Sequence, residues 1–391
     1  MKHSIKYLLC AGMWAFLVLP ALADGDGKDM FNPITTGVTT LNIAPDARGG
    51  SMGDLGAATD PDVNSQYWNP SKYAFAFSSA GVSVSYTPWL RKLVNDINLA
   101  YVAGYWKFGG NDLQALSASL RYFSLGSVPT YDNSATLQNT VNPYEMALDL
   151  GYSRKLSSSF SMGVVFRFIY SDMGFGGLSS AEDMSGAAAF AADISGYQTV
   201  YPIIGRSECQ FSWGFNISNI GSKVSYDGGT NSSFRPTNLR LGFSFLVPIY
   251  DYNTLSINFD ANKLLVPAAP RQSDYTYTDS DGYEQYDTEA YNQAKEDFNN
   301  TGSISGIFKS FSDAPGGFKE ELQEIYFSTG LEYSYNRRFF VRAGYYYENK
   351  YKGNRQYAHF GAGFALNFFS LASAYVLPTS QISPLPYTLR F

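Results

Sequence analysis

The chain has 391 residues and a formal net charge of −6 at pH 7, and this acidic balance gives no support to nucleic-acid binding. Only 16% of its residues are charged, whereas it holds 31 Tyr, 29 Phe and 36 Gly, a balance that is unusual for a soluble domain. Beyond the N-terminal segment no run of about 18 apolar residues occurs, so a lipid-facing surface would have to be built from strands rather than from helices.

The start of the chain has the pattern of a secretory signal peptide. Two lysines precede an apolar run at residues 7–19, and Ala21 and Ala23 form a small-x-small cleavage site. The apolar run is too short for a membrane-spanning helix. We therefore expect residues 1–23 to be removed and the rest of the chain to be exported.

The next segment, residues 24–80, is rich in Gly, Pro, Asp and Asn and shows no alternation of apolar and polar residues. It also holds several aromatic residues, which favour burial. In a barrel that starts in the periplasm, such a segment can only hang below the pore or fold into it. We predict an N-terminal hatch or plug, with candidate residues Asp46, Arg48, Trp68, Asn69 and Pro70.

From residue 81 onward, apolar and polar side chains alternate over stretches close to the ~10 residues that a tilted strand needs to cross a bilayer. In residues 160–170, for example, Phe166 and Phe168 belong to an apolar row and Arg167 to the opposite row. We predict fourteen strands, near 81–88, 96–108, 113–124, 143–156, 159–171, 187–197, 207–220, 237–248, 252–262, 325–336, 338–349, 356–368, 369–377 and 384–391.

The connections between these strands alternate between short and long, with the 198–206 link as a mild exception that should be a short turn. A soluble β-sandwich also shows alternating residues, but its turns recur more often and its strands are shorter. The asymmetry is typical of outer-membrane barrels, in which the long loops face outward. The long connections are 125–142, 172–186, 221–236 and 263–324. We therefore predict an all-β fold, a transmembrane antiparallel barrel of about 14 strands over residues 81–391 with a hatch at 24–80.

The inventory of catalytic and metal-binding residues is small. After the signal peptide, the only histidine is His359 and the only cysteine is Cys209, so a His/Cys zinc site and an internal disulfide are not expected. A Ser-His-acid arrangement needs a single histidine and stays open. We expect no enzyme activity, no cofactor and no metal.

Charged residues also fall on the row that should face the lumen, where they either form structural ion pairs or line a conduit. They are Arg121, Glu145, Asp149, Arg167, Arg240, Asp260, Glu332 and Arg342.

The longest insertion, residues 263–324, carries twelve acidic residues, far more than it carries basic ones. It is either a solvated surface loop or a docking surface outside the cell. A sharp turn is expected near Pro315, and it would present flanking aromatic residues beside a charged rim, as in a small binding hot spot. Alternatively, the turn only packs the loop onto the barrel mouth. The candidate partner-binding residues are Phe311, Asp313, Pro315, Gly316, Gly317, Phe318, Glu320 and Glu321.

The same insertion carries a family resemblance. Residues 310–322, SFSDAPGGFKEEL, closely resemble a stretch of the PorV family, the FadL-like outer-membrane barrels of the type IX secretion system. Four further stretches are similar to this family and follow in the same order: APDARGG at 44–50, WNP at 68–70, DANKLLVP at 260–267 and PLPYTLRF at 384–391. The resemblance implies a fourteen-stranded barrel with a hatch, in agreement with the strand prediction.

The resemblance also implies a role in protein export. Such proteins receive cargo bearing a C-terminal sorting domain from a SprA (Sov)-type translocon and carry it to the PorU sortase, in an attachment complex with PorZ and PorQ. It implies an integral outer-membrane location, in contact with outer-membrane lipid, with loops at the cell surface. Two alternatives remain. A FadL-like transporter of small hydrophobic molecules predicts an apolar pocket beside the hatch and an opening in the wall. A factor in, or enzyme of, lipid A deacylation predicts a Ser or carboxylate beside His359 at the outer rim.

Overall fold

The computed structural model describes most of the chain outside its N-terminal segment. The predicted signal peptide lies outside the described residues, as do most of the 172–186 connection and the start of the last predicted strand. The described residues are 31–91, 96–131, 134–174, 186–227, 232–379 and 388–391. Within these ranges no helix is both long and apolar enough to cross a membrane.

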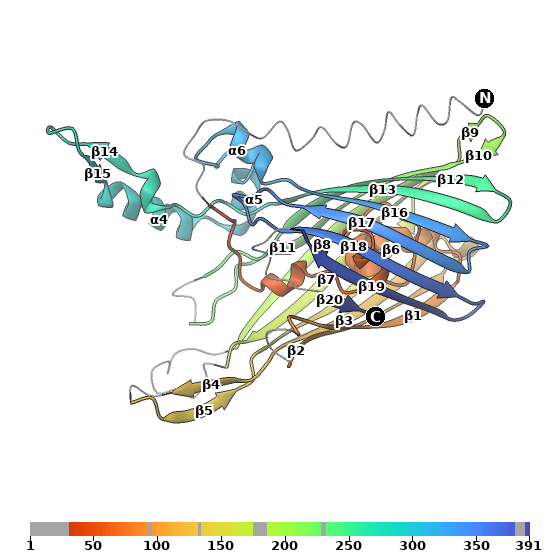
Figure 1. Cartoon of the computed structure of the whole chain (residues 1–391), viewed down its shortest axis with the longest axis horizontal. Helices are drawn as coiled ribbons and strands as arrows, with labels where there is room; N and C mark the ends of the chain where they lie inside the picture. Colours follow the sequence, from red (N-terminus) through yellow and green to blue (C-terminus); the bar gives the residue numbers. More distant parts are fainter. Residues whose placement is uncertain (1–30, 92–95, 132–133, 175–185, 228–231, 380–387) are drawn as a thin grey trace.

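A sheet of fourteen antiparallel strands curls into a barrel, and each strand pairs with the next one in chain order (Figure 1). Tyr86 and Phe391 join the first strand to the last through backbone N–H···O bonds of 3.0 and 3.1 Å. All fourteen predicted strands are present, so the predicted fold class is confirmed. The strands are β1 (Ala80–Pro88), β2 (Ile97–Phe108), β3 (Gln114–Leu125), β6 (Tyr144–Lys155), β7 (Phe160–Asp172), β8 (Ala187–Val200), β11 (Gln210–Gly221), β12 (Asn238–Tyr250), β13 (Asn253–Leu264), β16 (Tyr326–Tyr335), β17 (Phe339–Tyr347), β18 (Gln356–Ala365), β19 (Ser370–Pro378) and β20 (Thr388–Arg390).

The connections differ between the two ends of the barrel (Figure 1). We call the end with the tight turns the turn end and the opposite one the loop end. Short hairpins that alternation alone did not reveal extend some connections. At the loop end, β4 (Val128–Tyr131) pairs with β5 (Leu137–Val141). At the turn end, β9 (Ile203–Ile204) pairs with β10 (Ser207–Glu208), so the 198–206 link forms a small hairpin instead of the simple turn that we expected.

The two faces of the barrel wall differ as the alternation predicts. On β7, Phe166 is 54% exposed on the outer face while the neighbouring Arg167 is 5% exposed on the inner face, because consecutive residues of a strand point to opposite sides. All eight charged residues that the alternation placed in the lumen are buried. Many of them are paired, as Arg167 is with Asp149 at 2.7 Å and with Asp193 at 3.0 Å.

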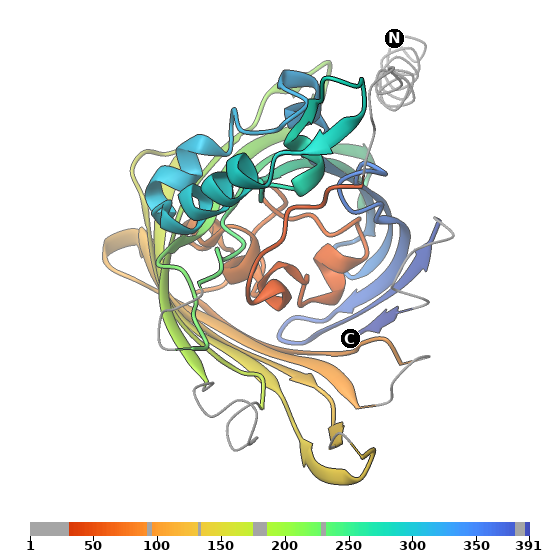
Figure 2. The ribbon, with the colours of Figure 1, turned by 90° about the vertical axis from the view of Figure 1, so that its left-hand side faces the viewer.

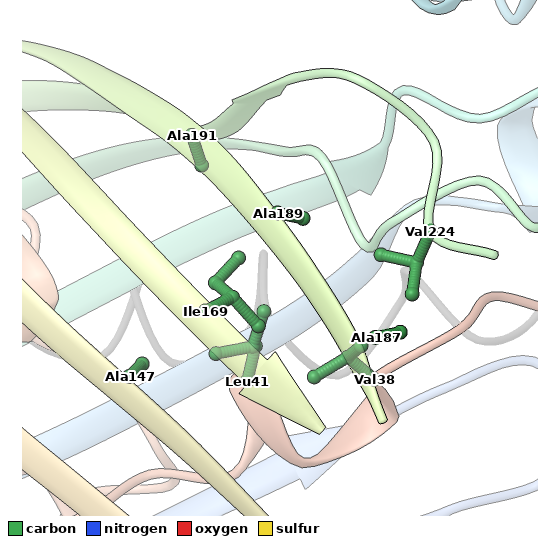
Figure 3. Close-up of a cluster of buried hydrophobic side chains, with 8 residues drawn as sticks. All are labelled: Val38, Leu41, Ala147, Ile169, Ala187, Ala189, Ala191 and Val224. Carbon is green, nitrogen blue, oxygen red and sulfur yellow. The ribbon is translucent and has the colours of Figure 1, made fainter. Parts of the chain in front are cut away.

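Most of the segment 31–79 lies inside the ring of strands, as seen from the loop end in Figure 2, and we call this segment the hatch. Their short helices are η2 (Thr39–Asn42), α2 (Ala47–Gly50), α3 (Ser65–Trp68) and η3 (Pro70–Phe75). Val38 and Leu41 pack against small and branched side chains of β6, β7 and β8, such as Ile169 and Ala189 (Figure 3). Alanines along β8 leave the space that this part of the hatch fills.

The predicted hatch residues form the internal scaffold of this segment. Asp46 caps α2 by accepting from the Gly49 N–H at 2.8 Å, and its other oxygen accepts from the Trp68 indole N–H at 2.6 Å. The buried Asn69 donates its amide to the Ala57 carbonyl at 2.8 Å and to the Gly196 carbonyl of β8 at 2.9 Å. Pro70 begins η3, where its fixed φ suits the first helical position.

Arg48 and Asp260 fix the hatch to a second part of the wall, formed by β16 and β13. The Arg48 guanidinium donates two bonds of 3.1 Å to Glu332 of β16 and one of 2.9 Å to Asp62 within the hatch. Asp260 of β13 accepts from the backbone N–H groups of Gly56 and Ala57 at 2.8 and 3.0 Å. Part of the lumen charge therefore serves to hold the hatch.

Candidate functional site

The insertion between β13 and β16 forms its own substructure at the loop end. A small hairpin and the helix α4 extend away from the barrel, while α5 and α6 lie closer to its mouth (Figure 1). The elements are η5 (Gln272–Asp274), β14 (Thr276–Thr278), β15 (Glu284–Tyr286), α4 (Thr288–Asn300), α5 (Ser303–Lys309) and α6 (Phe318–Gln323). The sequence predicted one insertion here, and the structure divides it into a projecting part and a part fixed to the barrel.

A buried cluster of charges fixes α6 to the barrel. Lys263, at the end of β13, donates to Glu321 at 2.9 Å and also to Glu324. Lys352, in the β17–β18 connection, donates to Glu324 at 3.1 Å and also to Glu320. Because each lysine contacts two carboxylates, and Lys263, Glu321, Glu324 and Lys352 are all buried, removal of one member would leave a buried charge short of partners.

The predicted turn before α6 is present, and backbone hydrogen bonds define it. The Gly317 N–H donates to the Ala314 carbonyl at 2.9 Å, and Gly317 has φ of +68° and ψ of −155°, a conformation that is nearly confined to glycine. The Ala314 and Gly316 N–H groups donate to Glu321 and Glu320 at 2.9 and 2.7 Å. Two carboxylates of α6 therefore satisfy the turn that precedes it.

Asp313 and Glu320 respond to their surroundings in opposite directions. Burial raises the pKa of Asp313 to about 6, and the nearby charges of Glu321 and Glu324 add to the increase. The hydrogen bond that its carboxylate accepts from the Ala268 N–H acts in the opposite direction and lowers this pKa. Burial also acts to raise the pKa of Glu320, but hydrogen bonds from Lys352 and the Gly316 N–H outweigh it and lower this pKa. Asp313 therefore loses its proton at a higher pH than Glu320 does.

Large apolar side chains of α5, α6 and the segment between them are exposed. Phe311 is 50% and Phe318 78% exposed. Ile304 and Phe308 are four residues apart on α5, and so are Phe318 and Leu322 on α6, a spacing that places each pair on one side of its helix. Each of the five is at least half exposed. We call Ile304, Phe308, Phe311, Phe318 and Leu322 the apolar loop surface.

The structure separates the predicted partner-binding residues into two groups. Phe311, Pro315, Gly316, Gly317 and Phe318 are exposed. In contrast, Glu321 is buried and Asp313 and Glu320 are only partly accessible, because they bind the turn, Ala268 and the two lysines. Glu321, one of the candidate partner-binding residues, is buried and serves as an internal anchor of the loop. Ile304, Phe308 and Leu322 were not among the predicted residues, although the four-residue spacings of Ile304 and Phe308 and of Phe318 and Leu322 were a usable signal.

His359 lies in the wall against the hatch rather than in an open site. It is fully buried on β18, and its Nδ1 lies 2.6 Å from the Gly50 carbonyl, so this nitrogen carries the proton and donates it. In the described ranges, no Ser or carboxylate hydrogen-bonds to the imidazole, and no group of three or more His, Cys, Asp and Glu residues is arranged to hold a metal ion.

Cavities beside the hatch have a polar lining. One of about 20 Å³ is lined by Arg121, Arg167 and Arg240, and one of about 80 Å³ is lined by Arg240, Arg355 and Arg390 together with aromatic residues. These two cavities therefore do not form the apolar pocket that a transporter for small hydrophobic molecules would need.

Comparison with known protein families decides the relationship. The family model described as type IX secretion system protein PorV matches residues 27–271, well over half of the chain. The chain belongs to the PorV family. Together with the fourteen-stranded barrel, this membership identifies an outer-membrane component of type IX secretion and confirms the resemblance found in the sequence.

Solved barrels resemble this PorV-family chain weakly over most of their length. The Pseudomonas putida toluene transporter TodX has a TM-score of 0.47 and 9% identity, with 92% of this chain and 98% of that chain covered. The Ralstonia pickettii toluene transporter TbuX has a TM-score of 0.43 and 10% identity, with 90% and 96% covered. A Pseudomonas aeruginosa FadL homologue has a TM-score of 0.39 and 11% identity, with 92% and 95% covered. A search of curated proteins finds no match.

Proposed function

We propose that this PorV-family barrel is a non-enzymatic carrier that receives cargo bearing a C-terminal sorting domain from a SprA (Sov)-type translocon. It then delivers the cargo to the PorU sortase in the attachment complex with PorZ and PorQ. In this proposal the loop end faces the cell surface. The observation that carries the proposal is the apolar loop surface, which stays exposed although α6, which carries Phe318 and Leu322, is fixed to the barrel by buried ion pairs.

The physical argument concerns what such a surface can do. Exposed aromatic side chains that cluster on an ordered support are typical of binding hot spots, since their burial in a complex supplies most of the binding free energy. Because the ion cluster around Lys263 and Lys352 already orders α6, a partner need not supply the free energy for ordering it. The acidic α4 and its hairpin project beyond this surface and would steer a partner during association rather than hold it.

The test is capture of partners by a double variant, Phe311→Ala with Phe318→Ala, at matched levels of inserted barrel. We expect recovery of translocon and cargo to fall at least about tenfold, since truncating two hot-spot residues costs more than ~1 kcal/mol each. The matched control is Tyr277→Ala with Tyr286→Ala, which removes two exposed aromatic side chains from the projecting hairpin of the same insertion. Equal recovery with both double variants would place the binding surface elsewhere on the barrel.

The non-enzymatic part of the proposal has its own test at His359. Because the imidazole donates to the Gly50 carbonyl, a structural role accounts for it. His359→Gln retains a donor, and we expect secretion and the state of lipid A to be unchanged in cells that carry it. Loss of lipid A deacylation with normal secretion would contradict this and support the enzyme alternative.

A further inference from the structure

The hatch crosses the barrel from one end to the other. At its start, the Asn32 N–H donates to the Tyr351 carbonyl of the β17–β18 connection at 2.7 Å, which places Asn32 at the loop end. At its end, the Ser79 carbonyl accepts from the Lys107 N–H of β2 at 2.7 Å, close to the tight turn that joins β2 to β3. We call residues 31–38 the leading segment of the hatch. This segment leaves the ring of strands at the loop end, on the side of the insertion (Figure 1).

The helix α6 contacts the leading segment through Glu320. The Asn32 side-chain amide donates to the Glu320 carboxylate at 3.3 Å. The same carboxylate accepts from Lys352 of the β17–β18 connection and from the Gly316 N–H in the turn before α6. Glu320 thus joins the hatch, the barrel mouth and the turn. Because α6 carries two members of the apolar loop surface, the position of this surface depends partly on where Asn32 lies.

A second contact links the leading segment to α4 and α5. The Gly37 N–H donates to the Phe234 carbonyl in the β11–β12 connection at 2.8 Å. The buried Phe234 ring packs edge-to-face against Phe298, near the end of α4, with ring centres 5.3 Å apart. Gly306 of α5 lies so close that a Cβ atom added to it would be 2.9 Å from the Phe234 ring. Through Phe234, the leading segment therefore supports both helices.

Val38, where the leading segment joins η2, has a strained backbone. Its φ of +52° and ψ of +49° lie in the left-handed region, which is unusual for a β-branched residue and persists only where the surroundings fix it. Its side chain belongs to a buried cluster with Ala187 of β8 and Val224 of the β11–β12 connection (Figure 3). Release of the hatch from the wall would let Val38 return to an extended conformation, and the leading segment would then change direction.

We propose that the leading segment couples the hatch to the apolar loop surface. The surface then binds its partner most tightly while the hatch is seated, and a bound partner in turn holds the hatch in the lumen, because coupling between two sites is reciprocal. The seated η2 fixes one end of the leading segment, so the bonds of this segment to α6 and to Phe234 form without further ordering. The inference rests on the proposed function, since it takes the apolar loop surface to be the binding site.

The first experiment needs no partner. Leu41→Ala weakens the seat of η2, because Leu41 is buried against Ile169 of β7. We expect amide hydrogen exchange in α5 and α6 to rise at least about tenfold, since loss of a buried leucine costs more than the ~1.4 kcal/mol that corresponds to a factor of ten. The matched control, Leu150→Ala, makes the same truncation on the exposed outer face of β6 and should leave this exchange unchanged. Exchange in α5 and α6 that is the same in Leu41→Ala as in the wild type would overturn the proposal.

A double-mutant cycle assigns the coupling to the leading segment. Asn32→Ala removes the bond to Glu320 and should raise exchange in α6, and also in η2 because the coupling is reciprocal. In the Asn32→Ala background, Leu41→Ala should have a clearly smaller effect on α6 than in the wild type, and strictly additive effects would overturn the proposal. Asn32 is only partly buried at the barrel mouth, so this variant remains informative if Leu41→Ala fails to insert. Unchanged exchange in η2 of Asn32→Ala would then overturn the proposal.

The last experiment measures recovery of translocon and cargo at matched levels of inserted barrel. Leu41→Ala should lower recovery at least about fivefold, the lower end of typical couplings between sites, while Leu150→Ala should not lower it. If Phe311→Ala with Phe318→Ala loses recovery and Leu41→Ala keeps it, the coupling is wrong and the proposed function stands. If neither variant loses recovery, the proposed function is wrong and the inference falls with it, even where the exchange experiment shows that the hatch and the insertion are coupled.

Discussion

The hatch and the insertion between β13 and β16 are both held to the barrel by ion pairs, yet their aromatic residues have opposite environments. In the hatch, Trp68 and Tyr73 are almost completely buried. In the insertion, Phe311 and Phe318 are exposed although the helix beneath them is anchored. Burying one such side chain stabilises a fold by about 2–3 kcal/mol. The hatch has already gained that free energy within the barrel, whereas in the insertion it is available to a binding partner.

Charged residues serve the same purpose in the hatch and in the insertion. Arg48 connects the hatch to Glu332, which Arg342 contacts as well, and Lys263 connects α6 to two glutamates. In both places the ions position a segment, and the difference lies in what that segment presents. Variants in the wall, the hatch and the insertion should therefore have clearly different consequences.

The largest effect is expected in the barrel wall. Phe243, in the middle of β12, is half exposed on the outer face, and Phe243→Arg should destabilise the folded barrel by roughly 2–4 kcal/mol because the charge would face the bilayer midplane. Urea titration of the protein folded into lipid vesicles measures this. Ile203→Arg, in the exposed β9 at the turn end, is the control and should cost about 0–1 kcal/mol. Equal costs would show that the outer face is wrongly assigned.

The second effect concerns the hatch. Arg48→Ala removes bonds to Glu332 and Asp62, and we expect hatch docking to weaken by about 1.5–3 kcal/mol, the range for hydrogen bonds to charged groups. Hydrogen exchange of residues 31–79 should increase, while Arg154→Ala, on the exposed face of β6, should leave it unchanged.

Conductance measurements test the position of the hatch independently. With the hatch inside the barrel, the intact protein should show little conductance in planar bilayers. We expect occasional openings in Arg48→Ala and none in Arg154→Ala. Large steady channels formed by the intact protein would contradict the prediction that the hatch blocks the lumen.

The third effect should be confined to the insertion. Lys263→Ala leaves Glu321 without its lysine, and Glu324 keeps only Lys352, so α6 should detach more readily from the end of β13. We expect faster proteolysis within the insertion with an unchanged unfolding midpoint of the barrel, because Lys263 lies at the very end of β13 and its substitution leaves the backbone pairing of that strand in place. Lys295→Ala, on the exposed part of α4, should change neither the rate of proteolysis nor the unfolding midpoint. A matching loss of barrel stability would mean that the insertion is part of the barrel's cooperative unit.

The smallest effect is the pH response of the same insertion. A pKa of Asp313 raised to about 6 means that the docked state holds its proton more tightly than the undocked one, so docking is strongest below about pH 4 and weakens as the pH rises through 6. The insertion should therefore be cut slightly faster at pH 7.5 than at pH 5. Asp313→Asn, which keeps the acceptor for the Ala268 N–H, should remove the difference. Glu320, whose pKa is lowered, has the opposite effect. Its charged form stabilises the docked insertion at neutral pH, and this stabilisation is lost as the pH falls through the lowered pKa.

How far the sequence alone leads is clear from particular residues. Alternation assigned Phe166 to the outer face and Arg167 to the lumen, and it located all fourteen strands, because a period of two is a local property of each strand. The turn at Gly317 was also predictable, since its conformation depends on residues adjacent in sequence. The hairpin of β4 and β5 was missed because its short strands lie beyond the bilayer and lack the alternation of the wall.

The remaining features depend on which distant segments meet. Glu321 looks like a surface carboxylate in the sequence, and only the approach of Lys263 from β13, 58 residues away, makes it an internal anchor. The larger cavity likewise requires Arg240, Trp68 and Tyr346, which belong to a strand, the hatch and another strand. The sequence by itself determined the strands, their two faces and the family, since short periodic patterns and local motifs encode them. The tertiary structure decided which charges are paired and which aromatic residues stay exposed, because burial and pairing depend on neighbours that no local pattern specifies.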